Sequence, residues 1–315
     1  MRVSAPNYEI FTVNYEIFTV NYVLIYLNIF SCYYVLSPNH IEAFMSLLKS
    51  ELVVKSNRLI EASYRLGLNE QRIILYAICR CREEEKGLNP ELPVTITADS
   101  FANHFPSIDR TNVYRQLKEA MDALYERSVT IHDIDPTSGH ARVKKTRWVS
   151  EAAYVDGAGN VQVIFTPEVI KYITRLEAEF TSYQLEKVGN MTSSYAVRIY
   201  ELLSQHREIG SRTLNLAWLR ETLGVEPNEY KLTADFKKWV IQVAVDQINK
   251  HSDLKVTCTP QKTGRAITDF AFKIKTKDRK PKAAGSANDQ AIREQLEANG
   301  QQRIPDPAAD DQEEF

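Results

Sequence analysis

The fold is decided by ADFKKWVIQVAVDQINK (residues 234–250) and by the two stretches after it, LKVTCTP (254–260) and AITDFAFKIK (266–275). Apolar residues recur along 234–250 at helical spacing, which predicts a long amphipathic helix. The residues expected to face a core are Phe236, Val240, Val243, Ala244 and Ile248. The two later stretches are expected to pair as strands across a turn at 261–265, giving a basic hairpin. A long helix followed at once by a hairpin indicates a winged helix.

The residues before this helix complete the same motif. Ser193–Gln205 is expected to form a helix and Leu214–Leu216 a short strand. Ala217–Leu223 is expected to form a short helix that stops at Gly224. After a turn, Thr233 offers the hydroxyl of an N-cap to the long helix. The order helix, strand, short helix, turn, long helix and hairpin is that of a winged helix.

The same order occurs earlier in the chain. The expected helix, strand, short helix and long helix are Asn69–Glu85, Val94–Thr97, Ala98–His104 and Arg110–Arg127. The hairpin is expected to pair Val129–Asp133 with a strand holding Arg142, Lys144, Lys145 and Arg147, and a third strand is Val161–Phe165. The sequence therefore predicts an α+β fold of two tandem winged-helix domains, at residues 45–178 and 179–282.

The net charge of −2 averages three unlike segments. Residues 1–44 carry one Arg against three Glu, and residues 45–282 carry 36 Lys and Arg against 30 Asp and Glu. Residues 283–315 carry two Arg against eight acids, and this acidic tail is expected to be disordered. Residues 231–282 hold 13 Lys and Arg against 5 acids, a concentration typical of a phosphate-binding surface, with a merely solvated surface as the alternative.

The two long helices and the hairpins are the expected DNA-binding surface. In a helix-turn-helix the second helix lies in the major groove and contacts base edges, while a hairpin contacts the neighbouring backbone. In the second domain the expected solvent face of the helix carries Lys237, Lys238, Ile241, Gln242 and Val245. The DNA-binding residues expected there are Lys231, Thr233, Lys237, Lys238, Gln242, Lys262 and Arg265. In the first domain they are Arg110, Thr111, Asn112, Arg115, Lys118, Lys144, Lys145 and Arg147.

The chain begins with an unchanged heptapeptide repeat, NYEIFTV, at 7–13 and again at 14–20. No residue from Ile17 to Asn39 is charged, so a membrane anchor is one interpretation, although Asn21 and other polar residues interrupt the apolar run. A signal peptide and a coiled coil fit less well. Seven residues correspond to about 21 base pairs, or about two turns of B-DNA. The favoured interpretation of residues 1–44 is therefore a translated tandem DNA repeat upstream of a normal start at Met45.

Several stretches carry a resemblance to a known family. They are VVKSNRLI (53–60), LNEQR (68–72), FKKWV (236–240), AVDQIN (244–249), DLKV (253–256), KTGR (262–265) and FAF (270–272). Over about residues 50–277 the chain resembles the replication initiators of iteron plasmids, the Rep family. The resemblance implies that monomers bind double-stranded tandem origin repeats and that dimers, in equilibrium with them, repress their own gene at an operator. It also implies recruitment of host replication proteins such as a helicase or initiator. The second domain would make the stronger repeat contacts, and the first would add contacts and the dimer interface.

No motif indicates an enzyme. The six histidines include no His-x-His pair for a nuclease, there is no GxxxxGK[ST] loop for an ATPase, and the four cysteines form no CxxC. We expect no catalytic residues, no metal, no cofactor, a cytoplasmic location and no membrane partner. A purely transcriptional winged-helix repressor is the alternative, and a membrane-tethered regulator depends on residues 17–39.

Overall fold

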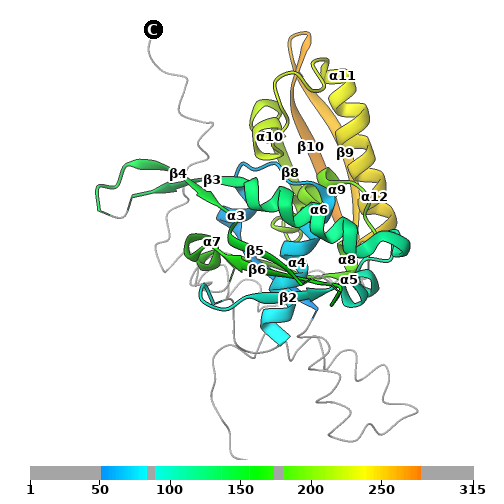
Figure 1. Ribbon diagram of the computed structural model, residues 1–315. Helices are drawn as coiled ribbons and strands as arrows, with labels where there is room; N and C mark the ends of the chain where they lie inside the picture. Colours follow the sequence, from blue (N-terminus) through cyan, green and yellow to red (C-terminus); the bar gives the residue numbers. More distant parts are fainter. Residues whose placement is uncertain (1–50, 84–88, 136, 156, 174–179, 278–315) are drawn as a thin grey trace, which may run out of the picture.

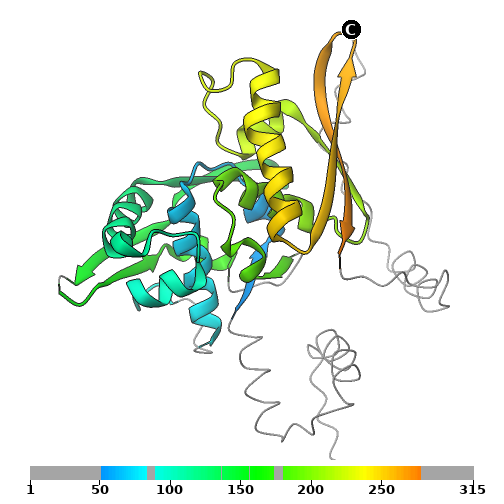
Figure 2. The same ribbon diagram turned by 90° about the vertical axis from the view of Figure 1, so that its right-hand side faces the viewer.

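The computed structural model describes residues 51–83, 89–135, 137–155, 157–173 and 180–277. This part of the chain contains two winged-helix units that contact each other (Figures 1 and 2). The segments 1–44 and 283–315, for which the sequence predicts a translated repeat and a disordered tail, lie outside the described residues. Within the described ranges, no helix combines the length and apolar character needed to cross a bilayer.

The second unit follows the expected order of elements. They are α9 (Ser194–Ser204), β8 (Ser211–Asn215), α10 (Leu216–Thr222), α11 (Thr233–Phe236), η2 (Lys237–Gln242), α12 (Val243–His251), β9 (Leu254–Thr263) and β10 (Ala266–Thr276). The strands form an antiparallel sheet in the order β8-β10-β9. Gly224 ends the helical turn after α10 at a φ of 65°, and a Cβ there would lie 2.6 Å from the Tyr64 carbonyl oxygen. Only glycine suits both this left-handed conformation and this close approach of the two units.

The segments α11, η2 and α12 form one continuous helix, Thr233–His251, with a π-helical middle. Its buried residues Phe236, Val240, Ala244 and Ile248 recur every four positions. In a regular α-helix each step of four overshoots one turn by about 40°, so such a stripe would rotate off the core. The π-helical hydrogen bonds span five residues and place more residues in each turn. The π segment therefore keeps the period-four stripe against the sheet.

The first unit repeats this topology. Its elements are α4 (Leu68–Glu83), β2 (Val94–Thr97), α5 (Ala98–His104), the short turn η1 (Arg110–Asn112), α6 (Val113–Glu126), β5 (Val149–Val155) and β6 (Asn160–Phe165). The sheet order is β2-β6-β5, which is equivalent position by position to β8-β10-β9. The wing of the first unit is therefore the β5–β6 hairpin.

The basic hairpin expected to be this wing is a different structure. β3 (Ser128–Ile134) pairs with β4 (Ala141–Arg147) in a separate two-stranded sheet, inserted between α6 and β5. Figure 1 shows it projecting away from the rest of the molecule. The strands were predicted correctly, but their role as the wing was wrong because the local pattern does not reveal which strand returns to β2.

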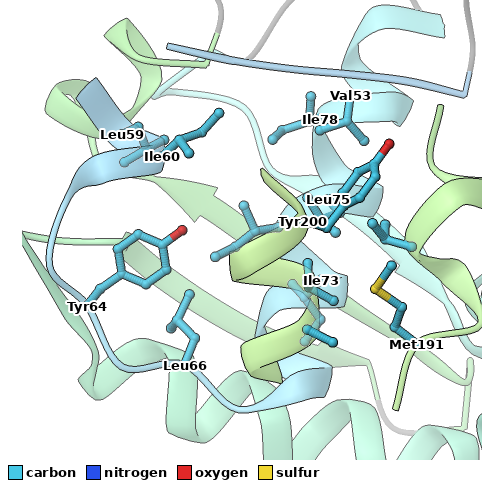
Figure 3. Close-up of a cluster of buried hydrophobic side chains, with 14 of the residues drawn as sticks. Val53, Leu59, Ile60, Tyr64, Leu66, Ile73, Leu75, Ile78, Met191 and Tyr200 are labelled. Atoms are coloured by element: carbon cyan, nitrogen blue, oxygen red, sulfur yellow. The ribbon is translucent and has the colours of Figure 1, made fainter. Parts of the chain in front are cut away.

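A further strand pair joins distant parts of the chain. β1 (Leu52–Ser56) pairs with β7 (Phe180–Gln184), so β7 completes a sheet with the first unit although it lies beyond the expected boundary at residue 178. Short helices α3 (Asn57–Glu61), α7 (Pro167–Lys171) and α8 (Glu186–Gly189) link these strands to their neighbours. Figure 3 shows the core where side chains of β1, α3, α4 and α9 meet, among them Val53, Ile78 and Tyr200.

A buried ion pair lies beside this core, between β1 and α9. Lys55 Nζ is 2.7 Å from Glu201 Oε1, and the Tyr183 hydroxyl donates to the same oxygen at 2.6 Å. Burial lowers the pKa of Lys55, while the facing carboxylate raises it and offsets part of that effect. Because the two partners come from β1 and from the first helix of the second unit, this pair ties the two units together.

Candidate DNA interface

The second long helix presents an exposed stripe away from the core. Lys238, Gln242 and Asp246 are exposed at a spacing of four residues. The Gln242 side-chain amide donates to Asp246 Oδ1 at 2.8 Å, which holds it along the helix surface. Lys238 and Gln242 therefore lie where the sequence predicts, on the helix face available to a DNA groove.

Other expected residues of this helix are placed differently. Ile241 and Val245, expected on the solvent face, are 2% and 6% exposed, because the period-four pattern turns them into the core. Thr233 is the first helical residue and Leu232 occupies the cap position, so Thr233 does not cap the helix. Lys231 is exposed just before it.

Lys237 is exposed on the flank of the helix that faces the sheet. Burial raises the pKa of the Cys258 thiol on β9 to about 12, and the positive charge of Lys237 acts in the opposite direction. The charge of Lys237 therefore lies close enough to β9 to act on the Cys258 side chain.

The β9–β10 wing is exposed at its tip. Gly264 has a φ of 63° and its surroundings are open, so the glycine is required by the turn and not by crowding. Lys262 and Arg265 flank it and are exposed. Figure 1 shows the wing tip and α11 at the same end of the molecule. Helix start and wing can thus reach one duplex together.

The first unit offers a smaller set of cations at the start of α6. Arg110 and Thr111 are exposed, and Asp109 accepts the Thr111 backbone N–H at 3.0 Å and the Asn112 amide at 3.2 Å. These hydrogen bonds lower the pKa of Asp109. Arg115 is exposed and pairs with Glu119 at 3.2 Å. Because exposed pairs of this kind are weak, Arg115 can exchange Glu119 for phosphate at little cost.

Lys118 faces the wing of its own unit. Its ammonium lies 4.8 Å from the ring centroid of Tyr154 on β5, and Tyr154 in turn donates to Asp122 of α6. Lys118 is half-buried. This environment makes Lys118 a packing residue between α6 and β5, in contrast to the exposed cations at the start of the helix.

Two cations of the β3–β4 hairpin are paired with acids, Lys144 in a half-buried cluster and Arg147 in an exposed and therefore weak pair. Lys144 Nζ lies 2.6 Å from Glu168 Oε1 and 3.4 Å from Asp133 Oδ2, and Arg147 lies 3.0 Å from Glu126. Lys145 is exposed. Residues 149–165, which hold the wing of the first unit, contain no Lys or Arg. The expectation of a basic wing in both units is therefore wrong for the first.

Together, two winged-helix units and an exposed basic helix face with its wing define the class of helix-turn-helix DNA-binding proteins. Family models agree: the Initiator Replication protein WH1 model matches residues 52–204, and the Initiator Rep protein WH2 model matches residues 215–274. They span about two thirds of the chain. The chain belongs to this family of replication initiator proteins.

The chain is similar to individual relatives and solved structures, of which the first below shares the fold. A crystal structure of the Pi initiator protein in complex with iteron DNA has a TM-score of 0.59 at 20% identity, covering 73% of this chain and 99% of that one. An uncharacterized 27.6 kDa protein of Escherichia coli is 24% identical over 233 residues, covering 72% of this chain and 96% of that protein. The WH1 domain of MSBI1.176, a replication protein isolated from a multiple sclerosis patient, is 39% identical over 36% of this chain and 83% of that domain, with a TM-score of 0.31.

Proposed function

We propose that this protein starts plasmid replication in the cytoplasm by binding tandem origin repeats, or iterons, in double-stranded DNA. The observation that carries this is the exposed pair Lys238 and Gln242 on the second long helix, whose start α11 lies at the same end of the molecule as the tip of the wing that carries the exposed Lys262 and Arg265. Family membership supplies the initiator role. The Pi initiator protein, which shares the fold, is known bound to iteron DNA, which supports the same ligand here.

The two units contribute unequally in this proposal. The second unit presents its cations on both helix and wing, so it provides the main repeat contacts. The first unit provides further contacts through Arg110, Thr111 and Arg115 at the start of α6, and Lys145 on the inserted hairpin. Its wing carries no cation, so the first unit binds DNA phosphates more weakly than the second.

We further propose that a dimer represses the protein's own gene and that the monomer recruits host replication proteins such as a helicase. The tandem 21-base-pair repeat expected in the DNA that encodes residues 7–20 is the candidate operator and origin repeat, because it precedes Met45. We propose no catalytic role for any residue.

A repressor without initiator activity is the second candidate, because two winged helices suit an operator equally well. Permanganate reactivity of supercoiled origin DNA separates the two. We expect the purified full chain to make thymines beside the repeats reactive at protein concentrations that saturate the repeats. Binding to the repeats without any opening of the neighbouring DNA, and without replication of an origin plasmid, would leave only the repressor.

A further inference from the structure

Trp239 is a large aromatic residue exposed on the second long helix. It is 53% exposed, whereas Trp148 is fully buried and Trp218 is half-buried. The core side of the helix is already occupied by Phe236 and Val240, so Trp239 has no packing role there. Tryptophan is usually largely buried, so this half-exposed indole differs from the other two tryptophans of the chain and is available to a ligand of the helix.

The period-four geometry places Trp239 beside the exposed stripe of Lys238 and Gln242. Trp239 shares its flank with Gln247, two turns later, whose amide donates to Thr192 Oγ1 at 3.0 Å. At that end the flank is covered by the segment that leads into α9. The flank is open at Trp239, in the half of the helix nearest the wing tip (Figure 1). A duplex that contacts Lys238 and Gln242 must therefore approach the indole.

The Trp239 ring offers DNA a mainly apolar surface beside one positive charge. The ammonium of Lys238 lies 4.4 Å from the ring centroid of Trp239, a cation–π distance that covers part of one ring face. The rest of the indole is a carbon surface with one hydrogen-bond donor, Nε1–H. In the major groove the apolar group is the thymine 5-methyl, and the other base-edge groups are hydrogen-bond donors and acceptors.

We propose that Trp239 is a specificity-determining residue that packs against a thymine methyl group in the major groove, an inference that rests on the DNA-binding function proposed above. Lys238, held over the ring, delivers its charge to a neighbouring phosphate while the ring contacts the methyl. Lys238 thus makes a sequence-independent phosphate contact, and the adjacent Trp239 makes a contact that depends on the base.

Uracil replacement tests the proposal, because uracil pairs as thymine does and lacks only the methyl group. We would replace each thymine of one origin repeat in turn and measure the affinity of the full chain for each duplex. At one position we expect about a fourfold loss for the wild type, the equivalent of one buried methyl. Trp239→Ala should bind thymine DNA more weakly and show no loss on replacement at that position.

Two further measurements distinguish a failure of the Trp239 proposal from a failure of the proposed DNA-binding function. Ile209→Ala removes another exposed apolar side chain, 70% exposed, and should keep the wild-type uracil response. The salt dependence of Trp239→Ala should match that of the wild type, because no charge is lost. A uracil response that persists in Trp239→Ala, or no response at any thymine in the wild type, overturns the proposal. A wild type that binds repeat and scrambled DNA equally instead defeats the function proposed above.

Discussion

Lys238→Ala removes one charge from the exposed face of the second long helix while leaving the core untouched. Each phosphate neutralised by a protein cation contributes about −0.9 to the slope of log K against log salt. If Lys238 contacts one phosphate, the variant slope should be shallower by about 0.9. Between about 50 and about 200 mM salt, the wild-type affinity should then fall about 3.5-fold more than that of the variant.

Fluorescence anisotropy titrations of labelled repeat DNA over a salt series measure this difference. Lys273→Ala is the matched control, because Lys273 is exposed on the face of the β8-β10-β9 sheet opposite to Phe272 and Ile274, which are buried. It lowers the net charge equally and should leave the slope unchanged. Equal slopes for wild type, Lys238→Ala and Lys273→Ala would show that Lys238 does not contact a DNA phosphate and that this helix face is not in the interface.

Three other predictions concern the wing, the buried ion pair and the tail. Arg265→Ala should weaken repeat and scrambled DNA by the same factor, because an exposed wing-tip cation contacts backbone phosphate; a loss confined to repeat DNA would make Arg265 a base-contacting residue. Lys55→Met should lower the free energy of unfolding by about 3 kcal/mol in urea titrations, because buried Glu201 loses the cation at 2.7 Å and keeps only Arg198 at 3.7 Å, whereas Lys250→Met at an exposed site should change it by less than about 0.5 kcal/mol. Removal of residues 283–315, which carry eight acids and two Arg, should leave the thermal transition in place and tighten binding to scrambled DNA; weaker binding after truncation would contradict this.

The spacing of apolar residues along the sequence predicted those helices and strands whose pattern is complete within one short stretch. The long helix at 234–250, its hairpin and the short helix at 98–104 were predicted within a few residues of their observed bounds. The pairing of β1 with β7 was not predicted, because its partners lie more than a hundred residues apart and neither strand is marked by flanking turns. The wing of the first unit was misassigned for the same reason. The β5–β6 hairpin is recognised as the wing only because β6 pairs with β2, and these strands are distant in the sequence.

The exposure of the cations on the second long helix and its wing was predictable from the sequence. Lys238, Lys262 and Arg265 are exposed as expected. The ion pair of Lys144 with Glu168 was not predicted, since Glu168 comes from α7, 24 residues later. Trp239 was missed because an ideal helical projection treats it as one more apolar residue, and only the π segment fixes which flank it occupies.

We propose that this initiator binds tandem repeats in its own upstream DNA. Hydroxyl-radical footprinting of the full chain on the DNA that encodes residues 7–20 tests it most directly. Protection should recur about every 21 base pairs on one face of the duplex, and it should be lost when the codons are scrambled without changing the peptide. Equal protection of native and scrambled DNA would contradict it.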